Sequence, residues 1–581
     1  MANTSQIKQR EYDKNITGLH ASPLLNRIYA ARGINNSQQL DLALQHMLEP
    51  AGLSHIEQAV NLLLSAISQD KRIVVVGDFD CDGATGTAVA MRGLQMLGAK
   101  QVYFKVPHRV LHGYGLTPGL VEELQELQPD LIITVDSGIA CNPGVALAKK
   151  YGWQVLITDH HLPGEQLPPA DVIVNPNLTG DAFASKALAG VGVVFYLLLA
   201  LRKRLREQNL PYADADISSL LDLVAIGTVA DMVKLDANNR RLVRAGLSRI
   251  NSGRCQPGVK ALIEISGLQM GEITETDIGF RLAPKINAAG RLEDMALGIE
   301  CLLANDQQAA TQMAISLAAI NSERQELQQL MLDEAELALE QILSLKHETQ
   351  PLAYVLHQAH WHPGIIGLLA SKVKEKCNRP VAVFAPSEAG SDELRGSARS
   401  IAGFHMRDAL AYIDAQNPGL ITRFGGHAMA AGMSLPVTHL QDFELAFQKV
   451  ASLWLTVESL DSVYLTDGPL LNHEFNRANA VLLKQGGPWG QGFAEPLFDN
   501  EFHVQSWQVL KDKHLKLQLK LASCPDKLCV SAIFFNAWQG QPPAEQIRAV
   551  YHLQTNDFRN KQDFQCLIRH IEAVSGEALL K

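Results

Sequence analysis

Short apolar runs that end at acidic residues recur through the first third of the sequence. Residues 73–76 run into Gly77-Asp78, and residues 131–135 run into Asp136. Similar runs cover 102–104, 155–158 and 172–174, with helical patterns such as 87–97 and 143–151 between them. Continuous apolar strands that alternate with helices are typical of a parallel sheet covered on both faces. The pattern therefore predicts an α/β lobe.

Acidic residues gather where these strands are predicted to end. They are Asp78, Asp80 and Asp82 after the first run, Asp136 after the third, and the triplet Asp159-His160-His161 after the fourth. Because ligands of open parallel sheets bind outside the carboxyl ends of the strands, we expect the three motifs to converge on one crevice. Asp231 follows an apolar, glycine-containing segment and is a weaker candidate, either a further ligand or a helix cap.

The closely spaced carboxylates of Asp78, Asp80 and Asp82 repel one another unless cations neutralise them or protons bind. A calcium loop of the EF-hand kind would need a bidentate Glu at its twelfth position, and counting from Asp78 that position is Val89. Carboxylates with one or two imidazoles suit Mn²⁺ or Mg²⁺ better than zinc. The sequence therefore predicts a site for Mn²⁺ or Mg²⁺.

The rest of the sequence predicts further parts. Residues 322–345 contain almost no helix breaker, and we interpret them as a helix connecting two lobes, with a coiled coil as the alternative. Apolar and polar residues alternate at 514–521, as in a half-buried strand of a small barrel, for which an OB-type barrel is one candidate. The predicted parts are an N-terminal helical segment at 1–70, a catalytic α/β lobe at 71–295, connecting helices at 296–350, a second α/β lobe at 351–460 and an OB-like β-barrel at 461–581.

Composition restricts the class of protein. A net charge of −10 argues against a protein that coats nucleic acid non-specifically, but it allows an enzyme with a local basic track. The eight cysteines form no CxxC pair, which favours a reducing, cytoplasmic setting. The apolar run 187–201 is shorter than the roughly 18–20 residues that span a bilayer, so we expect a buried helix and no membrane partner.

Several separated motifs resemble the DHH phosphoesterase superfamily, which takes its name from the triplet at 159–161. Four further segments look like the DHHA1 part of that superfamily: 290–292, 362–367, 397–400 and 424–432. The order of the parts, ending in a β domain, resembles the bacterial single-strand-specific 5′→3′ exonucleases of the superfamily. The resemblance covers roughly residues 70–575. It implies two α/β lobes with parallel sheets, DHH and DHHA1, joined by a long helix and followed by an OB-like barrel.

The resemblance also implies roles for individual residues. Two divalent ions, Mn²⁺ or Mg²⁺, would be held by Asp80, Asp82, Asp136, His160 and Asp231, with Asp136 bridging them. Asp78 and Asp159 would support these ligands, and His161 would lie beside the scissile phosphate. The DNA backbone or its 5′ end would be held by Arg109, Arg281, His362, Ser397, Arg399, Gly425, Gly426 and His427.

The implied function is 5′→3′ hydrolysis of single-stranded DNA in recombinational and mismatch repair. The implied protein is a monomer, with a single-stranded-DNA-binding protein and a RecQ-type helicase as partners. Trp489, Phe493 and Trp507 are candidates for stacking on bases, with burial in a core as the alternative. Phe493-Ala494 stand where these exonucleases usually carry Asn-Pro, which puts the local turn in doubt.

Two other functions stay open. A small-substrate phosphodiesterase or pyrophosphatase of the same superfamily would share the metal site, although the extra β domain argues for a polymeric substrate. A non-catalytic DNA-binding scaffold would be expected to have lost ligand residues, whereas the predicted set is complete.

Overall fold

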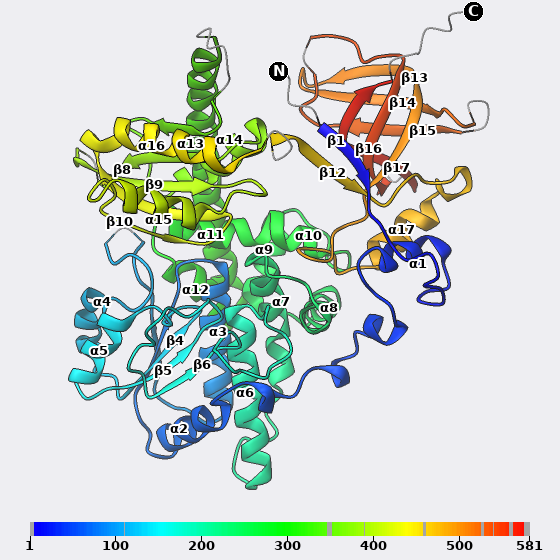
Figure 1. Ribbon diagram of the computed structural model, residues 1–581. Coiled ribbons are helices and arrows are strands. Elements are labelled where there is room, and N and C mark those ends of the chain that lie inside the picture. The colour runs from blue at the N-terminus through cyan, green and yellow to red at the C-terminus, as the bar shows by residue number, and fades with distance from the viewer. Residues whose placement is uncertain are drawn as a thin grey trace, which may run out of the picture. The chain divides into compact units, whose positions relative to one another are not determined.

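The computed structural model describes residues 5–109, 111–344, 351–388, 390–456, 460–524, 528–538, 540–556 and 562–574. These residues divide into two compact units (Figure 1). The first unit contains 48–231 and 245–462, and the second contains 5–47, 232–244 and the residues from 463 onward. The five-part division predicted from the sequence is a different subdivision, which this grouping does not test.

A five-stranded parallel sheet organises the first lobe of the first unit. Its strands, in spatial order, are β3 (Val102–Lys105), β2 (Ile73–Gly77), β4 (Leu131–Val135), β5 (Gln154–Thr158) and β6 (Val172–Val174). All four strand pairs are parallel, as predicted. Gly77 lies opposite Val135, and Val135 lies opposite Thr158, so three of the predicted acidic motifs start at the same edge of the sheet.

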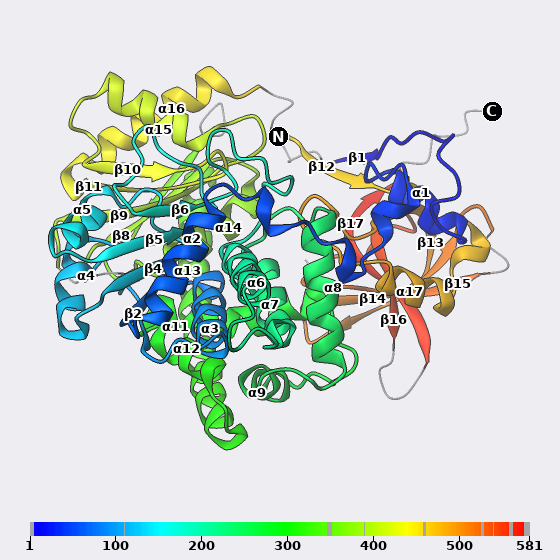
Figure 2. The same cartoon turned by 90° about the horizontal axis from the view of Figure 1, so that it is seen from below.

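Helices cover both faces of this sheet, as Figure 2 shows. One face carries α4 (Pro118–Glu123) and α5 (Asn142–Lys150), and the other carries α2 (Ile56–Ser68), α3 (Cys81–Met96), α6 (Gly190–Glu207) and α7 (Leu221–Ala230). Helix α6 contains most of the apolar run 187–201, and nearly all of its residues from 190 to 201 are buried, which confirms the prediction of a buried helix. Among the described residues, no helix is long and apolar enough to cross a membrane.

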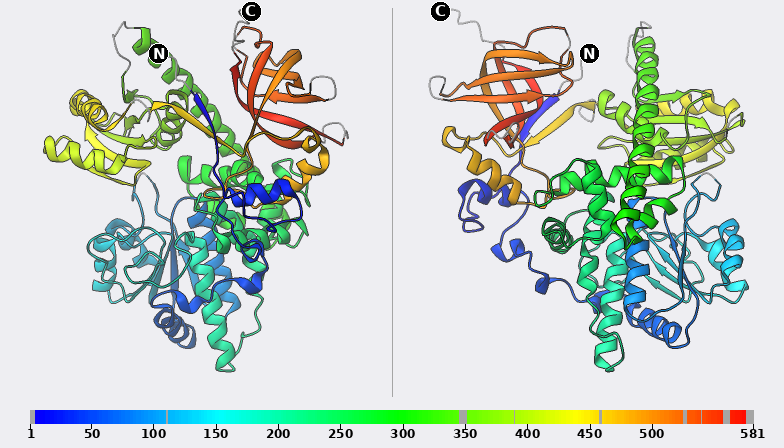
Figure 3. Two further views of the ribbon diagram at one scale, coloured as in Figure 1. Left: turned by 45° about the vertical axis from the view of Figure 1, so that its right-hand side comes forward. Right: turned by 180° about the vertical axis from the view of Figure 1, so that it is seen from behind.

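A set of helices leads from the first lobe to the second. They are α8 (Ala237–Asn251), whose first half is grouped with the second unit, then α9 (Pro257–Ile265), α10 (Glu275–Asp277), α11 (Ala283–Leu292), α12 (Ala296–Leu303) and α13 (Gln307–Ser344). Helix α13 is the predicted connecting helix and begins 15 residues earlier than the sequence suggested. It packs against α9, α11 and α12 and also against α14 of the second lobe (Figure 3).

The second lobe has a mixed sheet. Its strands, in spatial order, are β10 (Arg423–Gly426), β11 (Ala430–Pro436), β9 (Glu393–Arg399), β8 (Val381–Pro386) and β7 (Tyr354–His357). Its helices are α14 (Ile366–Cys377), α15 (Met406–Gln416) and α16 (Leu440–Trp454). Only β7 and β8 pair in parallel, so the prediction of a parallel sheet needs correction here. The links from β8 to β9 and from β10 to β11 are too short for the crossover that parallel pairing requires.

The second unit contains a closed five-stranded barrel. Its strands follow the order β13 (Phe498–Leu510), β14 (His514–Leu521), β15 (Cys529–Phe534), β17 (Asp563–Ala573) and β16 (Gln546–Asn556). The alternating segment 514–521 forms β14, with its leucines buried, as predicted. The unit also contains α1 (Pro23–Ala30), α17 (Arg477–Gln485), and the paired strands β1 (Ser5–Gln9) and β12 (Ser462–Thr466). Residues 5–9 were predicted to be helical, but β12 supplies them with backbone partners.

A compact aromatic cluster ties the N-terminal segment to the loop before the barrel. Trp489 and Phe493 are 6% and 3% exposed, and their rings stack at 5.1 Å between centroids. Both rings also stack on Tyr29. The guanidinium groups of Arg32 and Arg240 lie over Trp489 and Phe493, respectively. These two aromatic residues are therefore part of a core, which is one of the two alternatives that the sequence left open, and they are not available to stack on bases.

The close packing of α3 on the first sheet generates a test. An added Cβ at Gly86 would lie 2.6 Å from Val135 Cγ1 on β4, whereas one at Gly119 of α4 would meet nothing within 4 Å. We expect Gly86→Ala to destabilise the first unit by about 1–3 kcal/mol, because a packed core does not accept the extra methyl group. Differential scanning calorimetry measures the change. An unaltered transition, or an equal loss in Gly119→Ala, would contradict this packing.

Candidate metal and phosphate site

The junction between β2 and α3 presents three aspartates at the carboxyl edge of the first sheet. Asp80 is the N-cap of α3, and its Oδ1 accepts the Gly83 N–H at 3.0 Å. Asp82 lies in the first turn, and its carboxylate accepts the N–H groups of Gly190 and Val191 at 2.6 and 3.0 Å. These donors begin α6, where backbone N–H groups have no partner inside the helix. Two helix N-termini therefore hold the loop.

Asp136, His160 and Asp231 bring other strand and helix ends to the same place. His160 Nε2 lies 3.0 Å from Asp136 Oδ1 and 3.5 Å from Asp231 Oδ2. These contacts are close enough for ion pairs but lack the geometry of hydrogen bonds, so these three atoms and Asp78 Oδ1 are buried and make no hydrogen bond. Unpaired buried polar atoms are rare in folded proteins. Four of them in one carboxylate-rich cluster fit bound cations.

The candidate ligand atoms form three overlapping groups. Within each group the atoms lie within 4.8 Å of one another. The groups are Asp78 with Asp80 and Asp136, Asp82 with His160 and Asp231, and Asp136 with His160 and His161. All five predicted ligands belong to these groups, and Asp136 and His160 each belong to two. Asp78, predicted only to support the ligands, is also a member. The assignment of individual ligands stays a prediction.

Burial and mutual repulsion make the carboxylates hard to ionise. Burial, followed by the charge of Asp80, raises the pKa of Asp78 well above its usual range. Burial and the neighbouring carboxylates raise the pKa values of Asp82 and Asp136 in the same way. Burial and Asp80 also raise the pKa of Asp231, to about 7. Divalent cations would remove this repulsion and keep the groups ionised.

The three residues of the triplet after β5, Asp159, His160 and His161, have different environments. Asp159 Oδ1 accepts the backbone N–H groups of His160 and His161 at 2.7 and 3.1 Å and lies 2.8 Å from His161 Nδ1, while Oδ2 accepts the Ile139 N–H at 2.9 Å. Burial opposes ionisation of Asp159, but its bond to His161 holds its pKa below the usual value. Burial likewise opposes the charge on His161, yet Asp159 raises its pKa to about 9. Burial and then the charge of His161 lower the pKa of His160 to about 4, which leaves a neutral imidazole able to bind a metal.

Side chains from both lobes flank His161. The Tyr114 hydroxyl donates to the Asp136 carbonyl at 2.9 Å and lies 3.3 Å from His161 Nδ1. The ring of His427, from the turn between β10 and β11, stacks at 6.5 Å from the His161 ring. The predicted loop of the second lobe therefore reaches the edge of the metal-binding cluster.

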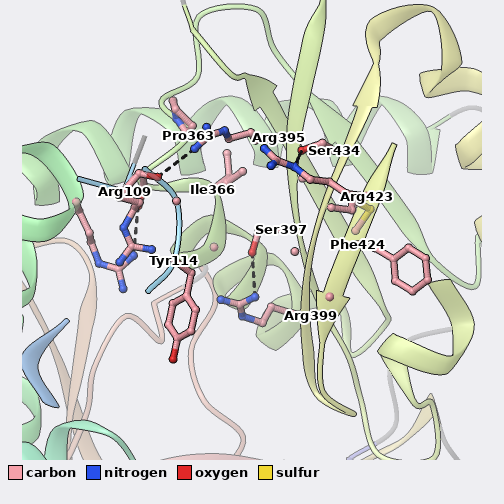
Figure 4. A pocket seen from close by; sticks show the side chains of 18 residues that line it. Arg109, Tyr114, Pro363, Ile366, Arg395, Ser397, Arg399, Arg423, Phe424 and Ser434 are labelled. Atoms are coloured by element: carbon pink, nitrogen blue, oxygen red, sulfur yellow. Dashed lines mark hydrogen bonds between the residues drawn. The ribbon is translucent and has the colours of Figure 1, made fainter. Parts of the chain in front are cut away.

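A cavity of about 460 Å³ lies between the two lobes and is lined by arginines (Figure 4). They are Arg109, Arg291, Arg395, Arg399 and Arg423, and the described lining residues include no carboxylate. Burial, followed by neighbouring arginines, lowers the pKa of Arg291 to about 9. Gly396, Gly425 and Gly432 leave bare backbone along the wall formed by β9, β10 and β11. A cationic wall with exposed backbone suits a phosphate group.

The predicted substrate-binding residues do not all line this cavity. Four of them do: Arg109, Ser397, Arg399 and Gly425. Gly426 and His427 continue the same strand and turn. His362 accepts the Gly364 N–H, beside the wall residue Pro363. Arg281 donates to the Ser266 carbonyl and is not among the lining residues. The DNA-binding roles of all eight stay predictions.

Three cavity arginines were missed as site residues in the sequence. Arg395 lies two residues before Ser397 on β9, and Arg423 lies two residues before Gly425 on β10. Residues two apart on a strand share a face, so strand alternation could have identified both. Arg291 lies within a recognised motif, but only the fold brings α11 to Gly364, whose carbonyl accepts the Arg291 guanidinium at 3.2 Å.

Comparison with known proteins gives three consecutive family matches. Residues 72–228 match the DHH family, N-terminal domain, residues 349–453 match the DHHA1 domain, and residues 466–570 match the RecJ OB domain. The last match identifies the five-stranded barrel as an OB domain, the candidate that the sequence suggested.

Full-length relatives share this order. The single-stranded-DNA-specific exonuclease RecJ of Dickeya dadantii is 45% identical over 94% of this chain and 96% of its own. The protein of the same description from Escherichia coli K12 is 43% identical over 97% of this chain and 99% of its own. The crystal structure of RecJ in complex with Mn²⁺ from Thermus thermophilus has a TM-score of 0.81 at 28% identity and covers 99% of this chain and 80% of that one. The chain therefore belongs to the RecJ family, with its DHH, DHHA1 and OB domains.

Proposed function

We propose that this chain is a metal-dependent exonuclease that hydrolyses single-stranded DNA from the 5′ end and acts in recombinational and mismatch repair. The observation that carries the proposal is the cluster of unpaired buried carboxylate and imidazole atoms in the same unit as an arginine-lined cavity. The relatives named above are described as single-stranded-DNA-specific exonucleases, which supports this substrate. Solved RecJ structures with Mn²⁺ and with Mg²⁺ support either ion as cofactor.

In this proposal, different residues bind the metal ions, donate a hydrogen bond to the phosphate and orient the catalytic groups. Asp80, Asp82, Asp136, His160 and Asp231 hold two divalent ions, and Asp78 adds a carboxylate to the same edge. When bound, two such ions supply Lewis-acid activation of a water and neutralise charge on the phosphoryl oxygens. His161, kept protonated by Asp159, donates a hydrogen bond to a phosphoryl oxygen as its charge grows. Asp159 itself orients the triplet through its four contacts.

The arginine-lined cavity gives a basis for end recognition. A terminal 5′-phosphate carries more negative charge than an internal phosphodiester, so it gains more from the arginines. The bare backbone at Gly396, Gly425 and Gly432 lets a phosphate or sugar approach closely. We therefore place the 5′ end in this cavity and the scissile bond at the metal cluster.

The wider setting is part of the same proposal. The eight cysteines, all within the described residues, form no disulfide, which supports a cytoplasmic location. We propose that the chain acts as a monomer, with a single-stranded-DNA-binding protein and a RecQ-type helicase as partners. We also propose the five parts 1–70, 71–295, 296–350, 351–460 and 461–581 as its domain boundaries.

Replacing Asp136 tests the metal site. Asp136→Asn keeps the size of the side chain but removes the charge shared by two ligand groups. We expect the rate on end-labelled single-stranded DNA with Mn²⁺ to fall at least about 100-fold, equal to about 2.7 kcal/mol. Asp214→Asn is the control, because the Asp214 side chain is fully exposed. Full activity of Asp136→Asn, or unchanged activity in EDTA, would refute the site.

Gly425 tests recognition of the 5′ end. A Cβ there would meet no atom within 4 Å, so Gly425→Ala should fold normally while its methyl group narrows the cavity. We expect KM for 5′-phosphorylated single strands to rise about 10-fold, equal to about 1.4 kcal/mol, with kcat within about twofold of the parent value. Gly119→Ala serves again as control. Equal rates on 5′-blocked and 5′-phosphorylated DNA would rule out recognition of the 5′ end. Rapid cleavage of dinucleotides without any cleavage of long single-stranded DNA would rule out the exonuclease.

The exposed aromatic pair of the barrel tests a role in strand binding. Trp507 is 43% exposed and stacks on Trp538 at 5.5 Å between centroids. We expect Trp507→Ala to weaken binding of long single strands by about 1–3 kcal/mol, the usual value of one base-stacking contact, and to leave hydrolysis of very short strands unchanged. Fluorescence anisotropy measures the binding. Unchanged affinity of Trp507→Ala for long single strands would exclude Trp507 from the DNA-binding surface.

A further inference from the structure

The loop that carries Asp78, Asp80 and Asp82 alternates acidic residues with Phe79 and Cys81. The acidic residues belong to the groups of candidate ligand atoms. The two intervening residues are instead held by α11 and by Arg109, neither of which supplies an atom to those groups. These two residues therefore help to set the spacing of the acids.

Cys81 is held through its backbone. It is the first residue of α3, so its N–H has no acceptor within the helix. The Oδ1 atom of Asn287, on α11, accepts this N–H at 2.9 Å. Because Cys81 lies directly between Asp80 and Asp82, this bond helps to fix the backbone that joins the two carboxylates, together with the N–H groups that the carboxylates themselves accept.

Phe79 is held on both its backbone and its ring. A Cβ added at Gly290 of α11 would lie 2.0 Å from the Phe79 carbonyl oxygen, so the helix backbone touches the loop directly. The Arg109 guanidinium lies 3.8 Å from the centre of the Phe79 ring, and its Nε donates to the Gly290 carbonyl at 2.9 Å. Only glycine allows this approach of α11 to the loop.

The residues of α11 that make these contacts share one face of the helix. Asn287, Gly290 and Arg291 have the i, i+3 and i+4 spacing that brings side chains together on one side. Arg291 lines the arginine cavity and donates to the Gly364 carbonyl of the second lobe. One turn of one helix therefore contacts both the aspartate loop and the cavity.

We propose that Asn287 is a positioning residue for the metal centre. It holds the Cys81 N–H and thereby sets the separation of the Asp80 and Asp82 carboxylates before any ion arrives. Residues that orient metal ligands from outside the coordination sphere commonly change metal affinity 10- to 100-fold when replaced. The inference rests on the metal site of the proposed function, but it requires neither DNA nor catalysis.

Titration of the full chain with MnCl₂, without DNA, tests the role of Asn287. The electron paramagnetic resonance signal of free Mn²⁺ measures how much of the ion is bound. We expect Asn287→Ala to weaken Mn²⁺ binding about 10-fold or more. Asn287→Asp keeps the accepting oxygen and should bind within about threefold of the parent protein. Asn251→Ala is the matched control, because Asn251 is also partly buried and accepts a backbone N–H, that of Ile273, at 2.8 Å. We expect it to bind Mn²⁺ within about twofold of the parent protein.

Several outcomes would overturn the inference. They are unchanged Mn²⁺ binding by Asn287→Ala, equal weakening by Asn251→Ala, or a loss in Asn287→Asp as large as in Asn287→Ala. If Asn287→Ala does not fold, Asn287→Ser replaces it, with an expected loss between those of Ala and Asp. A parent protein that binds no Mn²⁺ would refute the metal site itself. A parent protein that binds Mn²⁺ and degrades single-stranded DNA, with an unaffected Asn287→Ala, would refute only the role of Asn287.

Discussion

Repulsion among buried carboxylates at one edge of the first sheet is the constraint on which the rest of this structure depends. Parallel pairing brings the ends of β2, β4 and β5 together, so the acids that follow them cannot separate. Burial then removes the water that would screen their charges, and the pKa values of Asp78, Asp82 and Asp136 rise well above the usual range. Protons or cations must balance this charge, which makes metal binding and local stability one linked equilibrium.

Some of the surrounding residues have hydrogen-bond partners for both carboxylate oxygens, and others keep a buried polar atom that makes no hydrogen bond. Asp159 has partners for both carboxylate oxygens, and Asp82 accepts two N–H groups from the start of α6. Asp136, His160 and Asp231 each retain an unpaired buried atom. Asp159 therefore fixes positions, and the other three residues are available to ions. Asp82 combines both roles, because its carboxylate also lies in a group with His160 and Asp231. The arginine-lined cavity carries the opposite charge, because guanidinium groups line it and would attract an anion. A DNA strand would match both the carboxylate cluster and the cavity if its 5′-phosphate lay among the arginines and its scissile phosphodiester lay at the cluster.

The sequence predicted the parts of the site that depend on strand ends and missed those that depend on distant packing. Asp136 could be placed because an acid after a buried strand of a parallel sheet has one edge to occupy. Arg291 could not, because its neighbour Gly364 comes from another lobe. The same limit explains the corrections to the fold. β1 forms only because β12, from a remote part of the chain, pairs with it. The sequence likewise left open whether Trp489 stacks on bases or lies in a core, because Tyr29, which packs on it, lies far away in the chain.

The most direct test of the metal site is anomalous diffraction at the manganese absorption edge from crystals of the full chain grown with MnCl₂. Two ions should give two anomalous peaks at the carboxyl edge of the first sheet. One should lie at the group formed by Asp82, His160 and Asp231, and the other at the group formed by Asp78, Asp80 and Asp136. A single peak, peaks elsewhere in the chain, or no peak at a concentration that supports DNA hydrolysis would contradict the two-ion site.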